Sequence, residues 1–184
     1  NEDGFIDIVT ANLRGNSVSL LLGDGDAGFI ERREFPVGTR PLSVALADAT
    51  GDGHLDLVVA NSRSSNTSVL YGNGLGDFPE SMPLEAGRDP YDAACADLDL
   101  DGHRDVVTAN FGADNVSVAF GSGTGFAAPQ FFAVGESPYS LALADFDANG
   151  LLDILTANLN SDDLTLLLGS SGRSIQVLTR RVAY

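Results

Sequence analysis

The sequence predicts an all-β protein with the β-propeller architecture, about four blades of four antiparallel strands each. The chain repeats itself in steps of 49, 49 and 48 residues, measured between Gly4, Gly53, Gly102 and Gly150. Each repeat holds short runs rich in Val, Ile, Leu and Thr, bounded by Gly, Asn, Asp and Ser, and none shows helical periodicity. A period of roughly 40 to 50 residues is typical of a propeller blade, whereas a β-solenoid repeats at shorter periods.

Two strands in each repeat, which we name B and C, are the clearest. Three residues after each of these glycines comes an Asp, followed by an apolar run that ends in Ala-Asn and predicts strand B. These runs are Ile8 to Asn12, Leu57 to Asn61, Val106 to Asn110 and Ile154 to Asn158. A second run ending in Gly predicts strand C at Val18 to Gly23, Val69 to Gly72, Val116 to Gly121 and Leu164 to Gly169. Such runs between turn residues are typical of strands joined by hairpins.

The other two strands of a repeat are D, which is weaker, and A, which is almost uncharged. Strand D precedes Gly38, Gly87 and Gly135, and strand A follows at Ser43-Val-Ala-Leu-Ala, Asp92-Ala-Ala-Cys-Ala and Ser140-Leu-Ala-Leu-Ala. We expect strand A to be buried on both faces and to line the central channel. The first repeat has no strand A after Asn1, so we expect fifteen strands, the last of them a strand D within Ser174 to Tyr184.

The chain is expected to form a single propeller segment over residues 1–184, with repeats at about 1–38, 39–87, 88–135 and 136–184. The incomplete first repeat leaves ring closure open. A second copy of the chain could complete the ring as a homo-oligomer, because open sheet edges invite pairing. The segment could also be part of a larger propeller of seven or eight blades, and a closed ring of four blades is allowed.

Composition restricts the partners. The chain has 26 acidic and 10 basic residues and a formal charge of −16. This charge repels nucleic acids and anionic membrane surfaces and attracts cations. No apolar run approaches the roughly 20 residues of a membrane helix, so membrane insertion is not expected. Cys95 is the single cysteine, which excludes an intrachain disulfide, and its alanine neighbours indicate an ordinary buried residue.

The turn between strands A and B is the main candidate site, and the third repeat shows it in full. It reads Asp97-Leu-Asp99-Leu-Asp101-Gly102-His103-Arg-Asp105. Calcium takes six to eight oxygen ligands, and carboxylates at alternate positions can surround one ion. We expect ligands from positions 1, 3, 5 and 9, with the main-chain carbonyl of position 7, here His103, completing the set.

The other repeats carry variants of this loop, which predicts three full calcium sites and a fourth that is truncated. The expected ligand positions are Asp48, Thr50, Asp52, His54 and Asp56 in the second repeat, Asp145, Asp147, Asn149, Leu151 and Asp153 in the fourth, and Asn1, Asp3, Phe5 and Asp7 in the first. Because Thr50 and Asn149 are neutral, these two sites should bind calcium more weakly than the third repeat. The loops start like an EF-hand but have Val59, Thr108 and Thr156 where an EF-hand needs Glu at position 12.

These motifs carry a family resemblance. Besides the Asp loop, the repeats share Asp-(Ile/Leu/Val)-(Val/Leu)-x-Ala-Asn, then Val-Ser-(Val/Leu)-Leu-x-Gly, then a Gly-rich turn such as Gly23-Asp-Gly25-Asp-Ala-Gly28-Phe29. The chain resembles the FG-GAP/VCBS repeats of bacterial surface and secreted proteins, which are related to integrin α-subunit propellers and to lectins of the Psathyrella velutina type. The resemblance implies structural calcium in the A-to-B loops and an extracellular or cell-surface location.

The function expected from these features is an extracellular interaction or adhesion module that binds protein or carbohydrate on the propeller rim. No enzymatic activity is expected, because the chain has two histidines, one cysteine and no Ser-His-Asp or Cys-His arrangement. The imidazoles of His54 and His103 should point away from the metal. The alternatives are a propeller scaffold for a polysaccharide-degrading enzyme, since fold alone does not set function, and a purely structural spacer. Tyr91 and Tyr139 start two A strands and should either pack or face a ligand.

Overall fold

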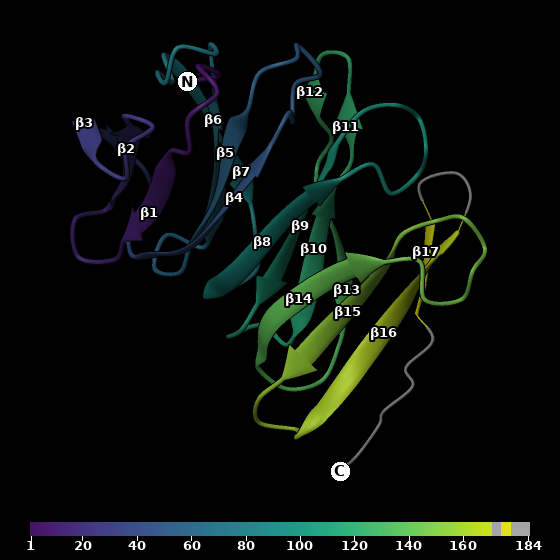
Figure 1. The fold of residues 1–184 in the computed structure, drawn as a ribbon. Coiled ribbons are helices and arrows are strands. Elements are labelled where there is room, and N and C mark those ends of the chain that lie inside the picture. Colours follow the sequence, from purple (N-terminus) through teal and green to yellow (C-terminus); the bar gives the residue numbers. More distant parts are fainter. Residues whose placement is uncertain (171–173, 178–184) are drawn as a thin grey trace.

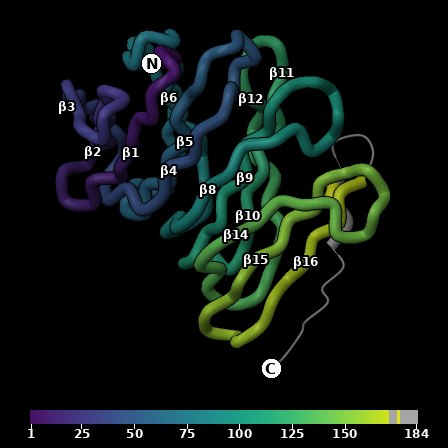
Figure 2. The backbone as a smooth tube through the Cα atoms, in the orientation of Figure 1, coloured from purple at the N-terminus to yellow at the C-terminus, as the bar shows by residue number. Residues whose placement is uncertain are grey.

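The computed structural model describes residues 1–170 and 174–177, and every regular element in this part of the chain is a β-strand. The strands form consecutive antiparallel sheets arranged side by side along an arc (Figures 1 and 2). Within the described residues, no helix is long and apolar enough to cross a membrane. The strands are β1 (Ile8–Asn12), β2 (Ser17–Gly23), β3 (Phe29–Pro36), β4 (Pro41–Ala47), β5 (Asp56–Asn61), β6 (Asn66–Tyr71), β7 (Glu80–Glu85), β8 (Pro90–Ala96), β9 (Asp105–Asn110), β10 (Asn115–Ala119), β11 (Gly121–Ser122), β12 (Gly125–Phe126), β13 (Gln130–Ala133), β14 (Pro138–Ala144), β15 (Asp153–Asn158), β16 (Asp163–Ser170) and β17 (Ser174–Val177).

Four sheets correspond to the four repeats, and we call them blades 1 to 4. Blade 1 has three strands in the order β1-β2-β3, and blade 2 has four in the order β4-β5-β6-β7. Blade 3 is β8-β9-β10-β13 and blade 4 is β14-β15-β16-β17. Each blade is an antiparallel meander, in which strands A to D follow one another in space as they do in the chain. The expected order of strands is therefore confirmed, including the three-stranded first blade.

The Asn at the end of strand B closes each B-to-C hairpin through side-chain hydrogen bonds that are buried or part-buried. Asn61 is fully buried, and its Nδ2 donates to Asn66 Oδ1 at 3.1 Å and to Ser68 Oγ at 2.9 Å. Asn110 makes the same pair of bonds in blade 3, to Asn115 at 2.8 Å and Ser117 at 3.1 Å. Ser68 and Ser117 end two Asn-x-Ser sequences of the kind that can accept an N-linked glycan. Both serines are buried and bind the hairpin asparagines, so their role in the fold explains these sequences.

The hydrophobic core lies between successive blades and alternates along each B strand. In β5, Leu57 and Val59 pack against blade 1. Their neighbours Val58 and Ala60 face the other way and pack against blade 3. All six residues of β5 and of β9 are buried. The B strands of blades 2 and 3 are therefore sandwiched between two neighbouring blades, and this explains why their sequences are continuous apolar runs.

The expectation that strand A is buried on both faces is wrong. In β4 and β14 most residues are half-buried or exposed, and Leu46 and Tyr139 keep 54% and 56% of their surface accessible. Strand A is the edge strand of its blade and lies on the inner side of the arc, where the described residues place no facing blade. Its small apolar residues reflect crowding between adjacent A strands. Cys95, on β8, is likewise only partly buried.

The fifteen expected blade strands are all present, and the described residues hold two further strands that the sequence did not predict. The C-to-D turn of blade 3 forms its own hairpin, β11 and β12, in which Gly121 pairs with Phe126. The sequence shows this stretch only as a glycine-rich turn. The last strand D is confirmed in part, because β17 pairs with β16. The remainder of the predicted Ser174 to Tyr184 segment, residues 178–184, lies outside the described residues.

Candidate metal centres

The A-to-B loops of all four blades share one backbone conformation. The fourth and sixth loop positions have positive φ, as in Leu100 at 59° and Gly102 at 88°. The same positions in the other loops are Glu2 and Gly4, Gly51 and Gly53, and Ala148 and Gly150. No atom lies within 4 Å of where a Cβ of Gly102 would stand. The glycine is therefore needed for its left-handed backbone and not for space.

The first Asp of each complete loop holds this conformation through backbone hydrogen bonds. In blade 3, Asp97 accepts from the amide nitrogens of Asp101 at 3.2 Å and Gly102 at 3.0 Å. Asp145 in blade 4 accepts in the same way from Asn149 and Gly150, and Asp48 in blade 2 from Asp52 and Gly53. The loop therefore folds around its own carboxylate.

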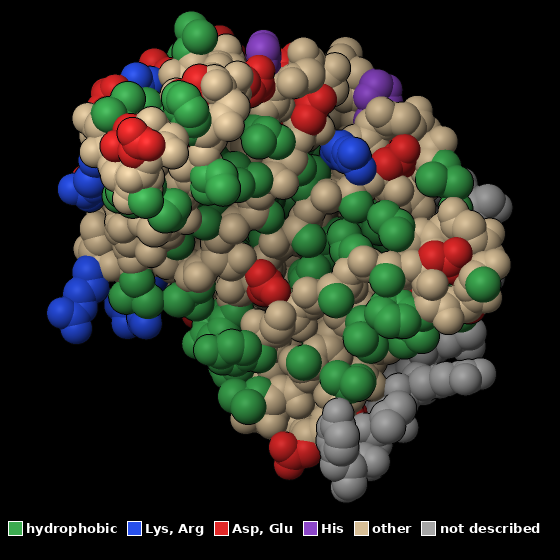
Figure 3. Space-filling view, in the orientation of Figure 1, with side chains coloured by type: hydrophobic (Ala, Val, Ile, Leu, Met, Phe, Trp, Pro, Cys, Tyr) green, Lys and Arg blue, Asp and Glu red, His purple; other side chains and the backbone are tan. Residues whose placement is uncertain are grey.

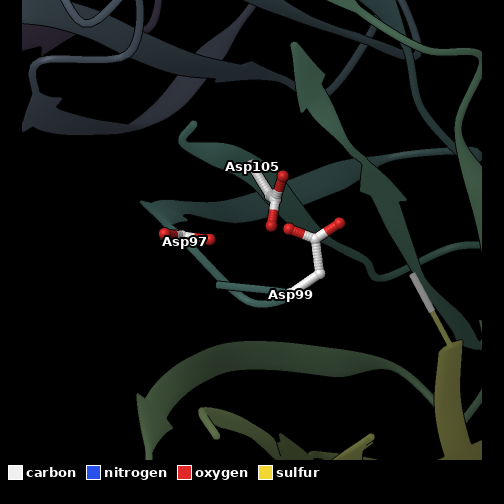
Figure 4. A group of neighbouring side chains, drawn as sticks. All are labelled: Asp97, Asp99 and Asp105. Carbon is white, nitrogen blue, oxygen red and sulfur yellow. The ribbon is translucent and has the colours of Figure 1, made fainter. Parts of the chain in front are cut away.

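Two of the loops gather three carboxylates each. Asp97, Asp99 and Asp105 place one oxygen apiece within 4.8 Å of one another, and Figure 4 shows the three side chains converging. Asp145, Asp147 and Asp153 form the same group in blade 4. Two oxygens on opposite sides of a calcium ion lie about 4.6 to 5.2 Å apart, since each bond is about 2.3 to 2.6 Å long. Both groups therefore fit an ion of this size and hardness.

The other predicted ligands are arranged differently. Asp48, Asp52 and Asp56 of blade 2 do not form such a group in the described part of the chain, and neither do the acids of blade 1. Residues at position 5 turn an oxygen toward their own loop, so that Asp101 and Asp52 each accept the amide of the following histidine at 2.9 Å. Asp3 of blade 1 accepts the amide of Phe5 at 2.8 Å. Asn149 of blade 4 accepts the amide of Leu151 at 2.7 Å. The His54 imidazole instead contacts Glu2 of the neighbouring loop at 3.0 Å.

The Asp at position 9 has a second role that the sequence analysis did not anticipate. Asp105 is fully buried and accepts the amide of Leu98 at 2.8 Å with one oxygen and that of Gly121 at 2.8 Å with the other. It thereby joins the start of the loop to the end of strand C. Asp56 and Asp153 bind the corresponding amides, of Ala49 and Gly72 and of Phe146 and Gly169. The equal 16-residue spacing between each Asp and its glycine could have revealed this pair.

Burial also changes the acidity of this carboxyl group. It raises the pKa of Asp105 to about 6, although its two amide donors act in the opposite direction and the nearby Asp99 and Asp101 add to the rise. Burial likewise raises the pKa of Asp56. A buried carboxylate surrounded by other carboxylates is destabilised by desolvation and repulsion, and a divalent cation would relieve both.

The glycine at the end of strand C is required by close packing. A Cβ on Gly121 would lie 2.1 Å from the carbonyl oxygen of Arg104, and one on Gly72 2.0 Å from that of Leu55. Gly23 and Gly169 stand in the same relation to Ile6 and Leu152, at 2.3 and 2.5 Å. None of these four glycines has a positive φ. The repeated Gly therefore lets the A-to-B loop, the candidate metal loop, lie directly on strand C.

The inner strands are joined by Asp92, whose role the sequence analysis also missed. Its carboxylate accepts from Ser43 Oγ on β4 at 2.8 Å and from Ser140 Oγ on β14 at 3.0 Å. It also accepts the amide of Leu141 at 3.1 Å. One side chain on blade 3 thus links blades 2 and 4.

At the opposite end of the blades from the metal loops, the two tyrosines form a cluster. Tyr91 stacks on Phe111, with ring centroids 4.2 Å apart, and meets the edge of Tyr139 at 5.5 Å. Tyr91 is therefore a packing residue, while Tyr139 remains more than half exposed.

Comparison with known proteins identifies the repeat. The sequence profile of the FG-GAP-like repeat matches residues 1–59, 48–108 and 97–156. The chain belongs to the FG-GAP-like repeat family. Each of the first two matches extends into the A-to-B loop of the next blade, so successive matches overlap at the acidic motif. None of the curated proteins compared with the chain matches it.

Solved structures similar to this FG-GAP repeat protein establish the propeller fold. BBS1N, in a complex with ARL6DN soaked with mercury, gives a TM-score of 0.61 at 13% identity over 97% of this chain and 51% of that one. A putative 6-phosphogluconolactonase from Bacteroides uniformis gives 0.65 at 13% identity over 96% and 53%. An Agrocybe aegerita lectin, solved for its recognition of non-reducing terminal N-acetylglucosamine, gives 0.53 at 17% identity over 96% and 53%. The chain thus spans about half the length of these structures, and its unclosed sheets form a partial propeller.

Proposed function

We propose that the protein is an extracellular interaction module in which calcium holds the A-to-B loops and the opposite turns bind protein or carbohydrate. The observation that carries this proposal is the convergence of Asp97, Asp99 and Asp105, and of their counterparts in blade 4, in loops already shaped by backbone hydrogen bonds. A lectin among the similar folds supports the carbohydrate part of the proposal.

Calcium would act structurally. The candidate ligands in each of blades 3 and 4 are its three clustered carboxylates. The side-chain oxygen of position 5 and the main-chain carbonyl of position 7, His103 or Leu151, would complete each set. When bound, the ion supplies positive charge that offsets the repulsion of its ligands, and binding to the native state alone raises the free energy of unfolding. The Asp at position 9 would couple the calcium-bound loop to strand C, because its carboxylate already accepts the amide of Gly121 or Gly169.

Thermal unfolding with and without calcium tests the structural role. We expect EDTA to lower the melting temperature and millimolar calcium to restore it, while magnesium restores it less because it demands a smaller octahedral site. A melting curve that does not change on chelation refutes structural calcium. Screening the calcium-loaded protein on a glycan array and against extracellular proteins tests the interaction role. The absence of any specific ligand in both screens would favour a structural spacer.

A further inference from the structure

Charge is unevenly distributed over the turns that lie opposite the metal loops. These turns are the B-to-C hairpins and the D-to-A connections, and each of the first three carries one arginine. Arg14 lies between β1 and β2, Arg40 between β3 and β4, and Arg63 between β5 and β6. The next turn carries Arg88, which pairs with Asp89 at 4.0 Å and donates to the Gly112 carbonyl, and the two turns after it carry Asp114 and Glu136. Figure 3 shows blue side chains projecting from the lower left of the molecule, the end away from the metal loops.

Backbone contacts bring the three arginine-bearing turns together. The amide of Arg40 donates to the Asn16 side chain at 3.0 Å, which joins the first turn to the second. Arg63 donates its amide to the carbonyl of Thr39 at 3.0 Å, which joins the second turn to the third. We call Arg14, Arg40 and Arg63 the arginine arc.

The guanidinium groups of the arginine arc are exposed and make no ion pair or side-chain hydrogen bond within residues 1–170 and 174–177. In contrast, Arg32 pairs with Glu34 at 2.8 Å and Arg33 with Glu31 at 2.9 Å. In a chain of charge −16, these three uncompensated cations on adjacent turns are available to an external anion.

We propose that the arginine arc binds an anionic polysaccharide, through the carboxylate or sulfate groups of its sugars. This inference rests on the proposed interaction function and names the ligand class. A guanidinium presents a planar fork of donors that matches a carboxylate or sulfate with two parallel hydrogen bonds. Hydroxyl groups lie between the arginines, with Thr39 and Ser64 exposed, and they can bind sugar hydroxyls.

The composition of the arc disfavours other anionic partners. Among the described residues, none of the exposed large hydrophobic side chains lies in these three turns. A membrane surface or a protein partner would usually require an apolar anchor there. Nucleic-acid binding relies on many closely spaced phosphate contacts, and the three arginines of the arc supply few of them. A hydrated sugar polymer with spaced anionic groups fits three arginines flanked by hydroxyls.

Calorimetric titration of the calcium-loaded protein with short hyaluronan oligosaccharides, which carry carboxylates, and with chondroitin sulfate oligosaccharides tests the proposal. We expect binding of one or both, and none of neutral dextran. Raising NaCl from about 50 mM to about 500 mM should weaken the binding, because exposed charge contacts are screened. Each of Arg14→Gln, Arg40→Gln and Arg63→Gln should raise the Kd by about three- to tenfold.

Arg32→Gln is the matched control, because it changes the net charge equally but lies on β3 and pairs with Glu34. It should leave the Kd within about twofold. Unchanged affinity in all three arc variants, or equal loss in the control, overturns the assignment. Failure to bind either oligosaccharide overturns it as well, while a ligand found on the glycan array would leave the interaction function standing. Equally tight, arc-dependent binding of poly-glutamate would overturn the polysaccharide class in favour of an acidic protein.

Discussion

The contact between strand C and the metal loop can be tested by adding a single methyl group, in the variant Gly121→Ala. Its Cβ would lie 2.1 Å from the Arg104 carbonyl oxygen, against 3.4 Å for an ordinary contact, so loop and strand must separate by about 1.3 Å (3.4 minus 2.1). This movement pulls the Gly121 amide away from the buried Asp105 carboxylate, now 2.8 Å away. Leaving that pair unsatisfied costs about 1 to 3 kcal/mol, and overpacking costs a similar amount.

An alanine also restricts the unfolded chain, which offsets about 0.4 to 1 kcal/mol of this loss. We therefore expect the free energy of unfolding to fall by about 2 to 4 kcal/mol, or the melting temperature by roughly 5 to 15 °C for a chain of 184 residues. Urea unfolding followed by circular dichroism measures the change. Calcium titration of the variant should show a weaker site in blade 3, because Asp105 is also one of the clustered carboxylates.

Gly123→Ala provides the control two residues away. The nearest atom to its added Cβ is 3.5 Å away, in the His103 ring, and Gly123 has no positive φ. This variant should change the free energy of unfolding by no more than about 0.5 kcal/mol. If Gly121→Ala proves as mild as Gly123→Ala, the close approach of loop and strand does not govern stability and our explanation of the repeated glycine is refuted.

Three other predictions concern the carboxylates. Asp97→Asn or Asp145→Asn should weaken calcium binding in its own blade by about tenfold or more, since each removes one charge from a group of three, and calorimetry should show the other blade unaffected. In calcium-free protein, the Asp105 pKa of about 6 exceeds the 3.8 of an unperturbed Asp, so the native state binds this proton more tightly and the group's contribution to stability falls as pH rises from about 4 to 7. Denaturant unfolding at pH 5 and pH 7 measures it, and a calcium-free protein that loses no stability between these values contradicts the prediction. Asp92→Ala should cost about 1 to 2 kcal/mol by urea unfolding because it removes an acceptor shared by part-buried and exposed donors on two neighbouring blades, whereas Ser43→Ala, which removes one donor, should cost about 0.5 to 1 kcal/mol.

The repeat and the order of strands could be predicted because strand B is apolar on both of its faces, which makes it easy to recognise in the sequence. Leu57 and Val59 face one neighbouring blade and Val58 and Ala60 the other, so the run must be apolar throughout. The loop acids were recognisable because calcium needs oxygen ligands at alternate positions. Both features are local in sequence, and recurrence in four copies made them visible.

The environment of strand A could not be predicted, because its burial depends on elements distant in sequence. Small residues such as those of β4 and β14 are compatible both with a filled channel and with an open inner surface. Asp92 was missed for a similar reason, since its partners Ser43 and Ser140 lie one full repeat away on either side. The Asp at position 9 was predicted as a metal ligand but not as the residue that joins the loop to strand C, because only the folded blade brings Gly121 to Asp105.

The proposed metal sites lie in blades 3 and 4, whereas the arginine arc lies on blades 1 and 2 at the opposite end of the molecule, and this separation constrains how they can influence each other. The six residues of β9 run from Asp105, in the metal loop, to Asn110, at the start of the opposite turn. At about 3.3 Å per residue this is a path of roughly 17 to 20 Å, too long for calcium to touch a ligand on the arc. Calcium can therefore affect ligand binding only by ordering the packed blades between them. Asp105, buried and hydrogen-bonded to Gly121, links the metal site to blade 3, the core shared by Val58 and Val106 joins blade 3 to blade 2, and the Asn61 hairpin bonds stabilise the arc end of blade 2. A ligand on the arc would in turn raise calcium affinity only to the extent that it stabilises this same hairpin, because coupling between two sites is reciprocal.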